Sequence, residues 1–255
     1  MRIFFLIFWI TVYCNIQLSA SECKKAGIAM TFDDTFIDQW YAARYLFIKY
    51  NAKATYFISR PYNINEVGYK KLRKLQDDGH EIGSHTIHHS GIRNHYNNDP
   101  SLVEQYLDEE IIPSIRILES HGLKISSFAH PYGQYTEAYN KMLLQNFLFI
   151  RATTYTSNNQ SVATLDNAFY SRSNDDRLLH AVGIDNKYNN SLESLQDAMI
   201  RAKNNSEVLV LYAHAIEVGE GLYRTPPERI EAILNFASEI GLEFYTISEL
   251  RTLCN

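Results

Sequence analysis

Acidic and histidine side chains recur in this sequence directly at the ends of apolar or β-branched runs. Asp33 and Asp34 follow the run 27–32, and His214 follows the run 208–213. The remaining residues of this kind are His85, His88, His89 and His130, with Arg151 near the end of a further run. In parallel α/β folds the carboxyl ends of the strands meet at one rim, where ligands bind. The pattern therefore predicts a functional cluster.

Two imidazoles and one carboxylate, with an open position left for water, are a common ligand set of catalytic zinc. His85 and His89 are four residues apart, which places both side chains on one face of a helical turn. His85 and His88, three residues apart, would also serve, so the spacing leaves the second imidazole open. A further carboxylate beside the ligands could act as general base on metal-bound water. These residues predict a metal-assisted hydrolase.

The segments that must position these residues alternate between strand-like and helix-like patterns. Runs typical of strands occupy residues 27–32, 54–59, 81–84, 127–130, 147–153, 208–213 and 243–247. Helical spacing of apolar residues occurs at 40–50, 66–78, 101–121, 137–145, 192–203 and 228–240. Such alternation favours parallel strands joined by crossover helices, hence a barrel or an open doubly wound sheet.

The chain of 255 residues is long enough for one large α/β domain, and no linker or repeat divides it. The span 155–190 has the weakest pattern, with one short strand candidate at 168–172, and we expect loops there. A formal net charge of −5 leaves no basic excess to neutralise phosphates, so nucleic acid is not an expected partner.

The first twenty residues have the features of a secretory signal peptide. Arg2 supplies a positive charge, residues 3–12 form an apolar run, and Leu18-Ser19-Ala20 ends in small residues suited to cleavage. The run is too short to cross a bilayer, so we expect no stable membrane span. We assign residues 1–20 to a signal peptide and 21–255 to the catalytic domain, and we expect a secreted protein, extracellular or periplasmic.

Four stretches around the clustered residues form an ordered set of motifs. The first two are Thr31-Phe32-Asp33-Asp34 and Gly79-His80-Glu81-Ile82-Gly83-Ser84-His85-Thr86-Ile87-His88-His89. The other two are Phe128-Ala129-His130-Pro131-Tyr132-Gly133 and Leu209-Val210-Leu211-Tyr212-Ala213-His214. In this order they resemble the motifs of the polysaccharide deacetylase family (carbohydrate esterase family four). The resemblance implies a single-domain α/β fold, a distorted (β/α) barrel of about seven strands.

The resemblance also implies roles for the motif residues. Asp33 matches the catalytic base, and Asp34, His85 and His89 match the ligands of a divalent metal, for which zinc is expected. The family pattern thus favours His89 over His88 as the second imidazole. Three further matches are His214 as the general acid, the backbone N–H of Tyr132 as the oxyanion donor, and Leu211 in the pocket for the acetyl methyl group.

The sequence departs from the family pattern in two places. Ala129 stands where many members carry arginine, and the Asp-x-x-Asp-Trp motif is missing, its nearest candidates being Asp175 and Asp176. Losing both charged partners together is coherent, because an unpaired buried charge would be costly. The catalytic base must then be oriented in another way, and Arg151 is the candidate replacement.

The implied function is removal of acetyl groups, most simply N-acetyl groups, from an amino-sugar polymer or oligosaccharide. An O-deacetylase with the same site is a close variant. The alternative from another class is a catalytically weak or inactive carbohydrate-binding relative. An unrelated metallopeptidase is disfavoured because the sequence lacks a His-Glu-x-x-His helix.

Two cysteines, Cys23 and Cys254, lie at opposite ends of the mature chain. In a barrel the first and last strands are neighbours, so both ends would come close together. Export would place the thiols in an oxidising compartment. We therefore expect a Cys23–Cys254 disulfide.

Overall fold

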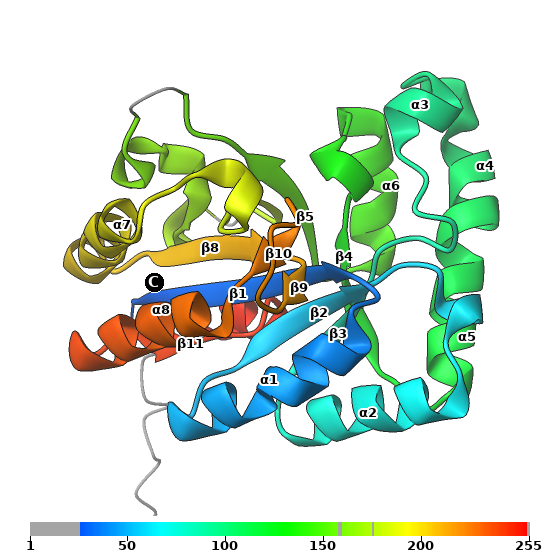
Figure 1. Cartoon of the computed structure of the whole chain (residues 1–255). Helices are drawn as coiled ribbons and strands as arrows, with labels where there is room; N and C mark the ends of the chain where they lie inside the picture. The colour runs from blue at the N-terminus through cyan, green and yellow to red at the C-terminus, as the bar shows by residue number, and fades with distance from the viewer. Residues whose placement is uncertain (1–25, 158–159, 175, 254–255) are drawn as a thin grey trace, which may run out of the picture.

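The computed structural model describes residues 26–157, 160–174 and 176–253. Seven parallel strands close into a barrel, because β1 pairs with β2 along one side and with β8 along the other (Figure 1). In spatial order the barrel strands are β1 (Gly27–Asp34), β2 (Ala54–Ile58), β3 (Glu81–Ser84), β4 (Ile125–Ala129), β5 (Phe149–Thr154), β7 (Leu178–Gly183) and β8 (Val208–Ala213). The expected seven-stranded (β/α) barrel and single domain are thus confirmed.

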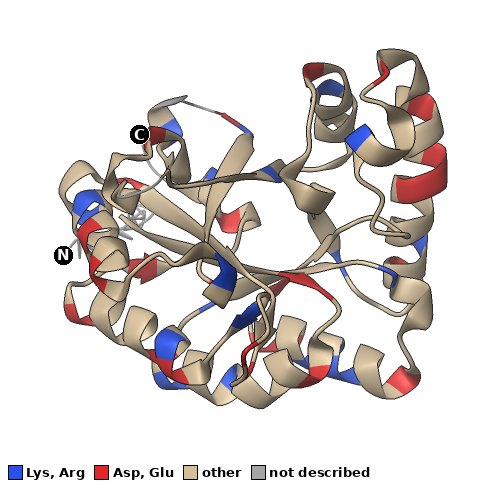
Figure 2. Ribbon diagram, turned by 45° about the horizontal axis from the view of Figure 1, so that its top comes forward, with Lys and Arg blue, Asp and Glu red and all other residues tan. Residues whose placement is uncertain are grey.

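Helices cover the outside of the barrel (Figure 1). They are α1 (Ile37–Lys49), α2 (Glu66–Asp77), α3 (Ile92–Tyr96), α4 (Val103–Tyr106), α5 (Ile112–Ser120), α6 (Glu137–Asn146), α7 (Leu192–Asn205) and α8 (Pro227–Glu239). The helix expected at 101–121 is instead a composite, in which a π turn, η3 (Leu107–Ile111), joins α4 to α5. Lys, Arg, Asp and Glu lie mainly on these outer helices and on loops (Figure 2).

Side chains of the strands alternate between two apolar layers, as the pleat of a strand requires. In β1, Ile28, Met30 and Phe32 belong to the large core shared with the helices. Ala29 packs instead with the second cluster, which fills the barrel interior. The same alternation turns Asp33 toward the interior at the carboxyl end of the barrel.

Two strand expectations are wrong. The span 155–190 supplies a full barrel strand, β7, where loops were expected, and its run Leu178–Gly183 was overlooked because polar His180 interrupts it. The run 243–247 forms only the short β11 (Glu243–Phe244). It pairs in parallel with β1 at Gly27 and Ile28 and does not close the barrel.

Besides β11, three further short strands lie outside the barrel. β6 (Phe169–Tyr170) pairs antiparallel with β8, and β9 (Ala215–Ile216) pairs with β10 (Arg224–Thr225). Within the described residues no helix is long and apolar enough to cross a membrane. The proposed signal peptide, residues 1–20, and both Cys23 and Cys254 lie outside the described residues, so the disulfide stays a prediction.

Candidate active site

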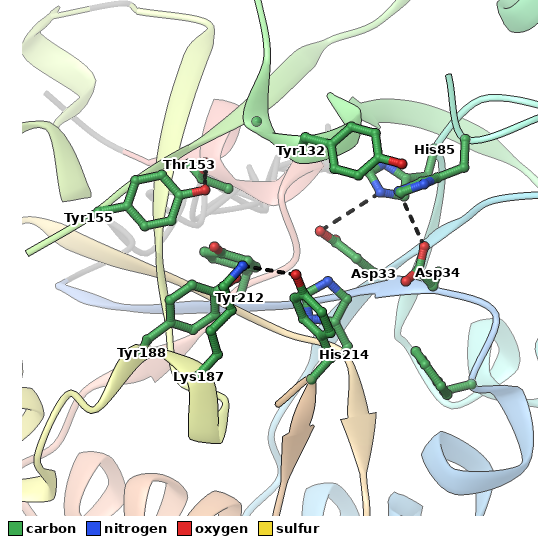
Figure 3. Close-up of a pocket in the computed structure, with 14 residues that line it drawn as sticks. Asp33, Asp34, His85, Tyr132, Thr153, Tyr155, Lys187, Tyr188, Tyr212 and His214 are labelled. Carbon is green, nitrogen blue, oxygen red and sulfur yellow. Dashed lines mark hydrogen bonds and ion pairs between the residues drawn. The ribbon is translucent and has the colours of Figure 1, made fainter. Parts of the chain in front are cut away.

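Asp34, His85 and His89 come together at the carboxyl end of the barrel; Figure 3 shows Asp34 and His85 there, beside Asp33. Asp34 ends β1, and the two histidines lie in the loop that follows β3. One potential ligand atom from each of the three lies within 4.8 Å of the others. The Nε2 atom of His89 is 3.4 Å from Oδ1 of Asp34. A carboxylate and two imidazoles therefore converge as a metal site requires.

The chemistry of the donor set also fits a metal. Nδ1 of His85 lies 2.8 Å from the carbonyl oxygen of Ala129, and a carbonyl only accepts, so Nδ1 carries the proton. Burial lowers the pKa of His85 well below its usual value, which keeps the ring neutral. Its Nε2 lone pair is then free toward the cluster. Burial likewise lowers the pKa of His89, although the charge of Asp34 opposes this shift.

Three residues of the site have left-handed backbones that L-residues rarely adopt. The φ angles are 80° at Asp34, 62° at His89 and 59° at Tyr132. Each such conformation costs about 1–3 kcal/mol and persists only where the surroundings enforce it. Strain concentrated at one rim is typical of a functional site. It shows that the fold, rather than local preference, sets these side-chain directions.

Asp33 lies beside the cluster and forms a buried ion pair with Arg151. A guanidinium nitrogen of Arg151 donates to Oδ1 of Asp33, and the other carboxylate oxygen lies 4.0 Å from Nε2 of His85. Arg151 has no exposed surface, and its guanidinium lies 5.3 Å from the Phe57 ring and 5.2 Å from the Tyr212 ring. An orienting role for Arg151 requires a direct contact with Asp33, and the ion pair provides it.

Arg151 occupies the place that Ala129 leaves open. In the parallel register of β4 and β5, Ala129 is the direct partner of Arg151. Paired residues on neighbouring strands point to the same face of the sheet. The small side chain at position 129 therefore leaves room for a guanidinium that arrives from the next strand.

His214, which follows β8, is held by a carboxylate that no sequence motif indicates, Asp185. Nδ1 of His214 lies 2.6 Å from Oδ2 of Asp185, and its backbone N–H donates to Oδ1 of the same residue. Thr225 also donates to Asp185, at 2.8 Å, which fixes the carboxylate. Burial alone would lower the pKa of His214, but the hydrogen bond to Asp185 and the nearby Asp33 charge outweigh it and raise the pKa.

Asp185 could have been found by the rule applied to the other residues, because it follows the barrel strand β7 by two positions. It was missed because β7 itself was missed. Asp175 and Asp176 were the candidates for the missing Asp-x-x-Asp-Trp motif, and Asp175 lies outside the described residues. Asp176 precedes β7 and accepts from the N–H of Leu178, so it lies at the opposite end of that strand.

A cavity of about 250 Å³ joins these groups. Its lining includes Asp33, Asp34, His85, His89, Tyr132 and His214. Three further lining residues, not anticipated from the sequence, lie across the pocket from Asp33 and Asp34: Tyr155, Tyr188 and Lys187 (Figure 3). Tyr223 also lines the pocket, with its ring centroid 4.9 Å from that of His214. Lys187 donates to the Tyr223 hydroxyl at 2.8 Å. The pocket thus combines the acids and imidazoles with a group of tyrosine side chains.

The turn after β4 places Tyr132 over the metal cluster, with its ring centroid 4.7 Å from that of His89. The hydrogen bonds of this turn run from Gly133 to His130 and from Gln134 to Pro131. Among the described residues, no acceptor is found for the Tyr132 N–H. The backbone donor expected at this position is therefore available.

The expectation for Leu211 is wrong. Leu211 is completely buried, belongs to the core between the barrel and the helices, and does not line the pocket. Tyr212, the next residue of β8, lines it instead. Alternation along the strand explains the difference, since neighbouring residues face opposite sides. His88 and His130 also lie outside the pocket lining.

Sequence comparisons place the first three motifs in a known family. The sequence pattern of the family described as polysaccharide deacetylase matches residues 20–146. A chitin deacetylase of Arthroderma benhamiae is 27% identical over 127 residues, which are 49% of this chain and 33% of that protein. The match therefore spans about a third of that relative.

Solved structures share the fold. The family 4 acetyl xylan esterase from Clostridium thermocellum, in complex with a cobalt ion, has a TM-score of 0.51 at 18% identity, covering 88% of this chain and 90% of its own. The catalytic domain of a peptidoglycan N-acetylglucosamine deacetylase from Eubacterium rectale has a TM-score of 0.52 at 16% identity, covering 89% and 93%. With the family match and the barrel in agreement, the chain belongs to the polysaccharide deacetylase family.

Proposed function

We propose that this protein is a metal-dependent hydrolase that removes N-acetyl groups from an amino-sugar polymer or oligosaccharide. The observation that carries the proposal is one pocket lined by a cation-binding triad, a carboxylate held by arginine and an imidazole held by a carboxylate. These are the parts that amide hydrolysis needs: a site for a Lewis acid, a base and an acid.

Asp34, His85 and His89 would hold a divalent cation, for which we propose zinc. Two neutral imidazoles and one carboxylate suit this ion and leave positions open for water and substrate. A cation bound there would polarise the acetyl carbonyl and make water more acidic.

The remaining groups supply proton transfer. Asp33, fixed by Arg151, takes a proton from the attacking water while the oxygen of that water bonds to the acetyl carbon. The Tyr132 N–H donates to the oxygen on which negative charge develops. His214, fixed by Asp185, gives a proton to the nitrogen as the carbon–nitrogen bond breaks. The products are acetate and a free amine.

The tyrosine side chains of the pocket support a sugar substrate. Tyr155 and Tyr223 are 55% and 45% exposed, and Tyr132 is 55% exposed. Exposed tyrosine rings offer flat apolar faces with a polar edge, which suit a pyranose ring. The relatives named for chitin and for peptidoglycan N-acetylglucosamine favour an N-acetyl group, whereas the acetyl xylan esterase makes O-acetyl the variant to test.

Acetate release from a panel of glycans tests the proposal. Zinc-loaded protein should release acetate from chitin oligosaccharides or peptidoglycan fragments faster than from acetylated xylan. Faster release from acetylated xylan would show that O-acetyl groups, rather than N-acetyl groups, are the substrate. Zinc binding with no acetate from any glycan would favour the carbohydrate-binding alternative.

A further inference from the structure

The loop that carries His85 and His89 has little regular structure to hold it. It connects β3 to α3, and it contains two left-handed residues, with φ of 68° at Thr86 and 62° at His89. Within the loop, the Ser90 N–H donates to the Thr86 hydroxyl at 3.2 Å. Because left-handed backbone is unfavourable at such residues, contacts from outside the loop must maintain it.

His85, at the start of the loop, is bound through its N–H to the carbonyl of Ile58 and through its ring to the carbonyl of Ala129. The residues just before His89 are bound by Glu110, in the π turn η3. The carbonyl oxygen of Glu110 accepts from the Ile87 N–H at 3.0 Å. One carboxylate oxygen accepts from the His88 N–H at 3.0 Å, and the other lies 3.0 Å from His88 Nδ1. A single residue thus binds the two backbone positions that precede His89.

The burial of Glu110 indicates that these contacts are its role. Its exposed fraction is 3%, and a carboxylate is rarely buried unless it is paired. Among the described residues, His88 alone contributes polar partners to this carboxylate. The π turn is also typical of functional positions in helices. Neighbouring Glu109, by contrast, accepts from Tyr96 and Gln105 and does not touch the loop.

We propose that Glu110 is a positioning residue of the metal centre: it fixes the backbone of the loop before His89 and thereby sets metal affinity. The inference rests on the proposed metal site. The contact to the backbone carries most of the effect, because the His88 ring is largely exposed and only adds a second anchor. His88 then supports the site through its backbone, without being a ligand.

Zinc affinity tests this directly. Zinc dissociation constants are measured by competition with a chromogenic chelator for the wild type, Glu110→Ala, Glu110→Gln and the control Glu109→Ala. Loss of a group that orients a metal ligand typically weakens affinity roughly 10–100-fold, which we expect for Glu110→Ala. Glu110→Gln keeps an oxygen for the His88 N–H and should lie between Glu110→Ala and the wild type. Glu109→Ala should bind like the wild type.

Hydrogen exchange of the metal-free proteins gives a second readout. The His88 amide should exchange faster in Glu110→Ala than in the wild type, and Glu109→Ala should leave it unchanged. Wild-type zinc affinity in Glu110→Ala would overturn the inference and leave the metal site intact. Failure of the wild type itself to bind zinc would instead overturn the metal site, and the exchange data would still report whether Glu110 holds the loop.

Discussion

At the scale of single residues, Asp33, the proposed base, is paired with the guanidinium of Arg151, while position 129 carries alanine. The register that pairs Ala129 with Arg151 lets the neighbouring strand supply the guanidinium to Asp33. Spacing alone could suggest Arg151, since it lies near the end of a predicted strand. It could not show that Arg151 points inward, because this depends on the strand register, which only the folded barrel defines.

An exchange of the two side chains tests this arrangement. Arg151→Met removes the charge at similar length, so Asp33 loses its orientation and turnover should fall roughly 10–100-fold, less than the 10²–10⁴ expected for loss of a base. Bound zinc should remain. Ala129→Arg in the Arg151→Met background should recover part of the rate. Thermal unfolding is followed in parallel, because breaking a buried pair also destabilises. An unchanged rate in Arg151→Met would exclude the role.

The Asp185–His214 pair predicts a shift in pH dependence. His214 must be protonated to act as an acid, and Asp185 raises its pKa, which extends activity toward alkaline pH. Asp185→Asn keeps an acceptor but removes the charge, so the pKa of His214 should fall. The alkaline limb of kcat/KM should then move to lower pH. A limb that stays in place in Asp185→Asn would argue against His214 as the acid.

The two adjacent imidazoles of the loop should behave differently. His89→Ala removes a ligand and should empty the site, whereas His88→Ala keeps the backbone contact to Glu110 and should retain most bound zinc. Elemental analysis of the two purified variants measures this. Zinc lost from His88→Ala and kept by His89→Ala would reverse the assignment.

At the scale of elements, sequence periodicity predicted most of the barrel and failed where the pattern was short or interrupted. The runs at β1, β2 and β8 stand out because they are buried on both faces and are therefore mainly apolar or β-branched. β7 is not predicted, because polar His180 interrupts its apolar run. Asp185 is therefore not recognised as a residue that follows a strand. The π turn before α5 was also not foreseen, since its extra residue leaves the apolar spacing nearly unchanged.

The turn after β4 carries a prediction at this scale. Gly133 has a φ of 66°, and a Cβ there would lie 2.0 Å from the Thr153 hydroxyl oxygen. Gly133→Ala should therefore displace the turn and its Tyr132 N–H, lowering kcat while zinc remains bound. Gly241→Ala is the matched control, because its φ is 76° and nothing lies within 4 Å. Both should lose about 1–2 kcal/mol of stability through the left-handed backbone, and Gly133→Ala should lose more because of the clash with Thr153. A kcat loss shared equally by both variants would remove the argument for the turn.

At the scale of the whole molecule, barrel closure joins β1 to β8 and so brings the Asp33–Asp34 pair beside His214, about 180 residues away in sequence. The sequence could predict that these residues share a rim, because parallel strands end together. It could not predict the group of tyrosine side chains in the pocket. Tyr155 and Tyr223 lie in loops, and Lys187 and Tyr188 lie in the short 3-10 helix Asn186–Tyr188, so no periodic pattern marks them. Only the closed barrel brings them together around the pocket.

Acetate release from a chitin oligosaccharide, before and after removal of metal, tests the central claim most directly. The account predicts release by the zinc-loaded protein, loss of release after treatment with a chelator, and recovery when zinc is restored. Zinc should not restore activity to Asp34→Ala, which lacks one ligand of the triad. Undiminished release from protein shown to be free of metal would contradict the account.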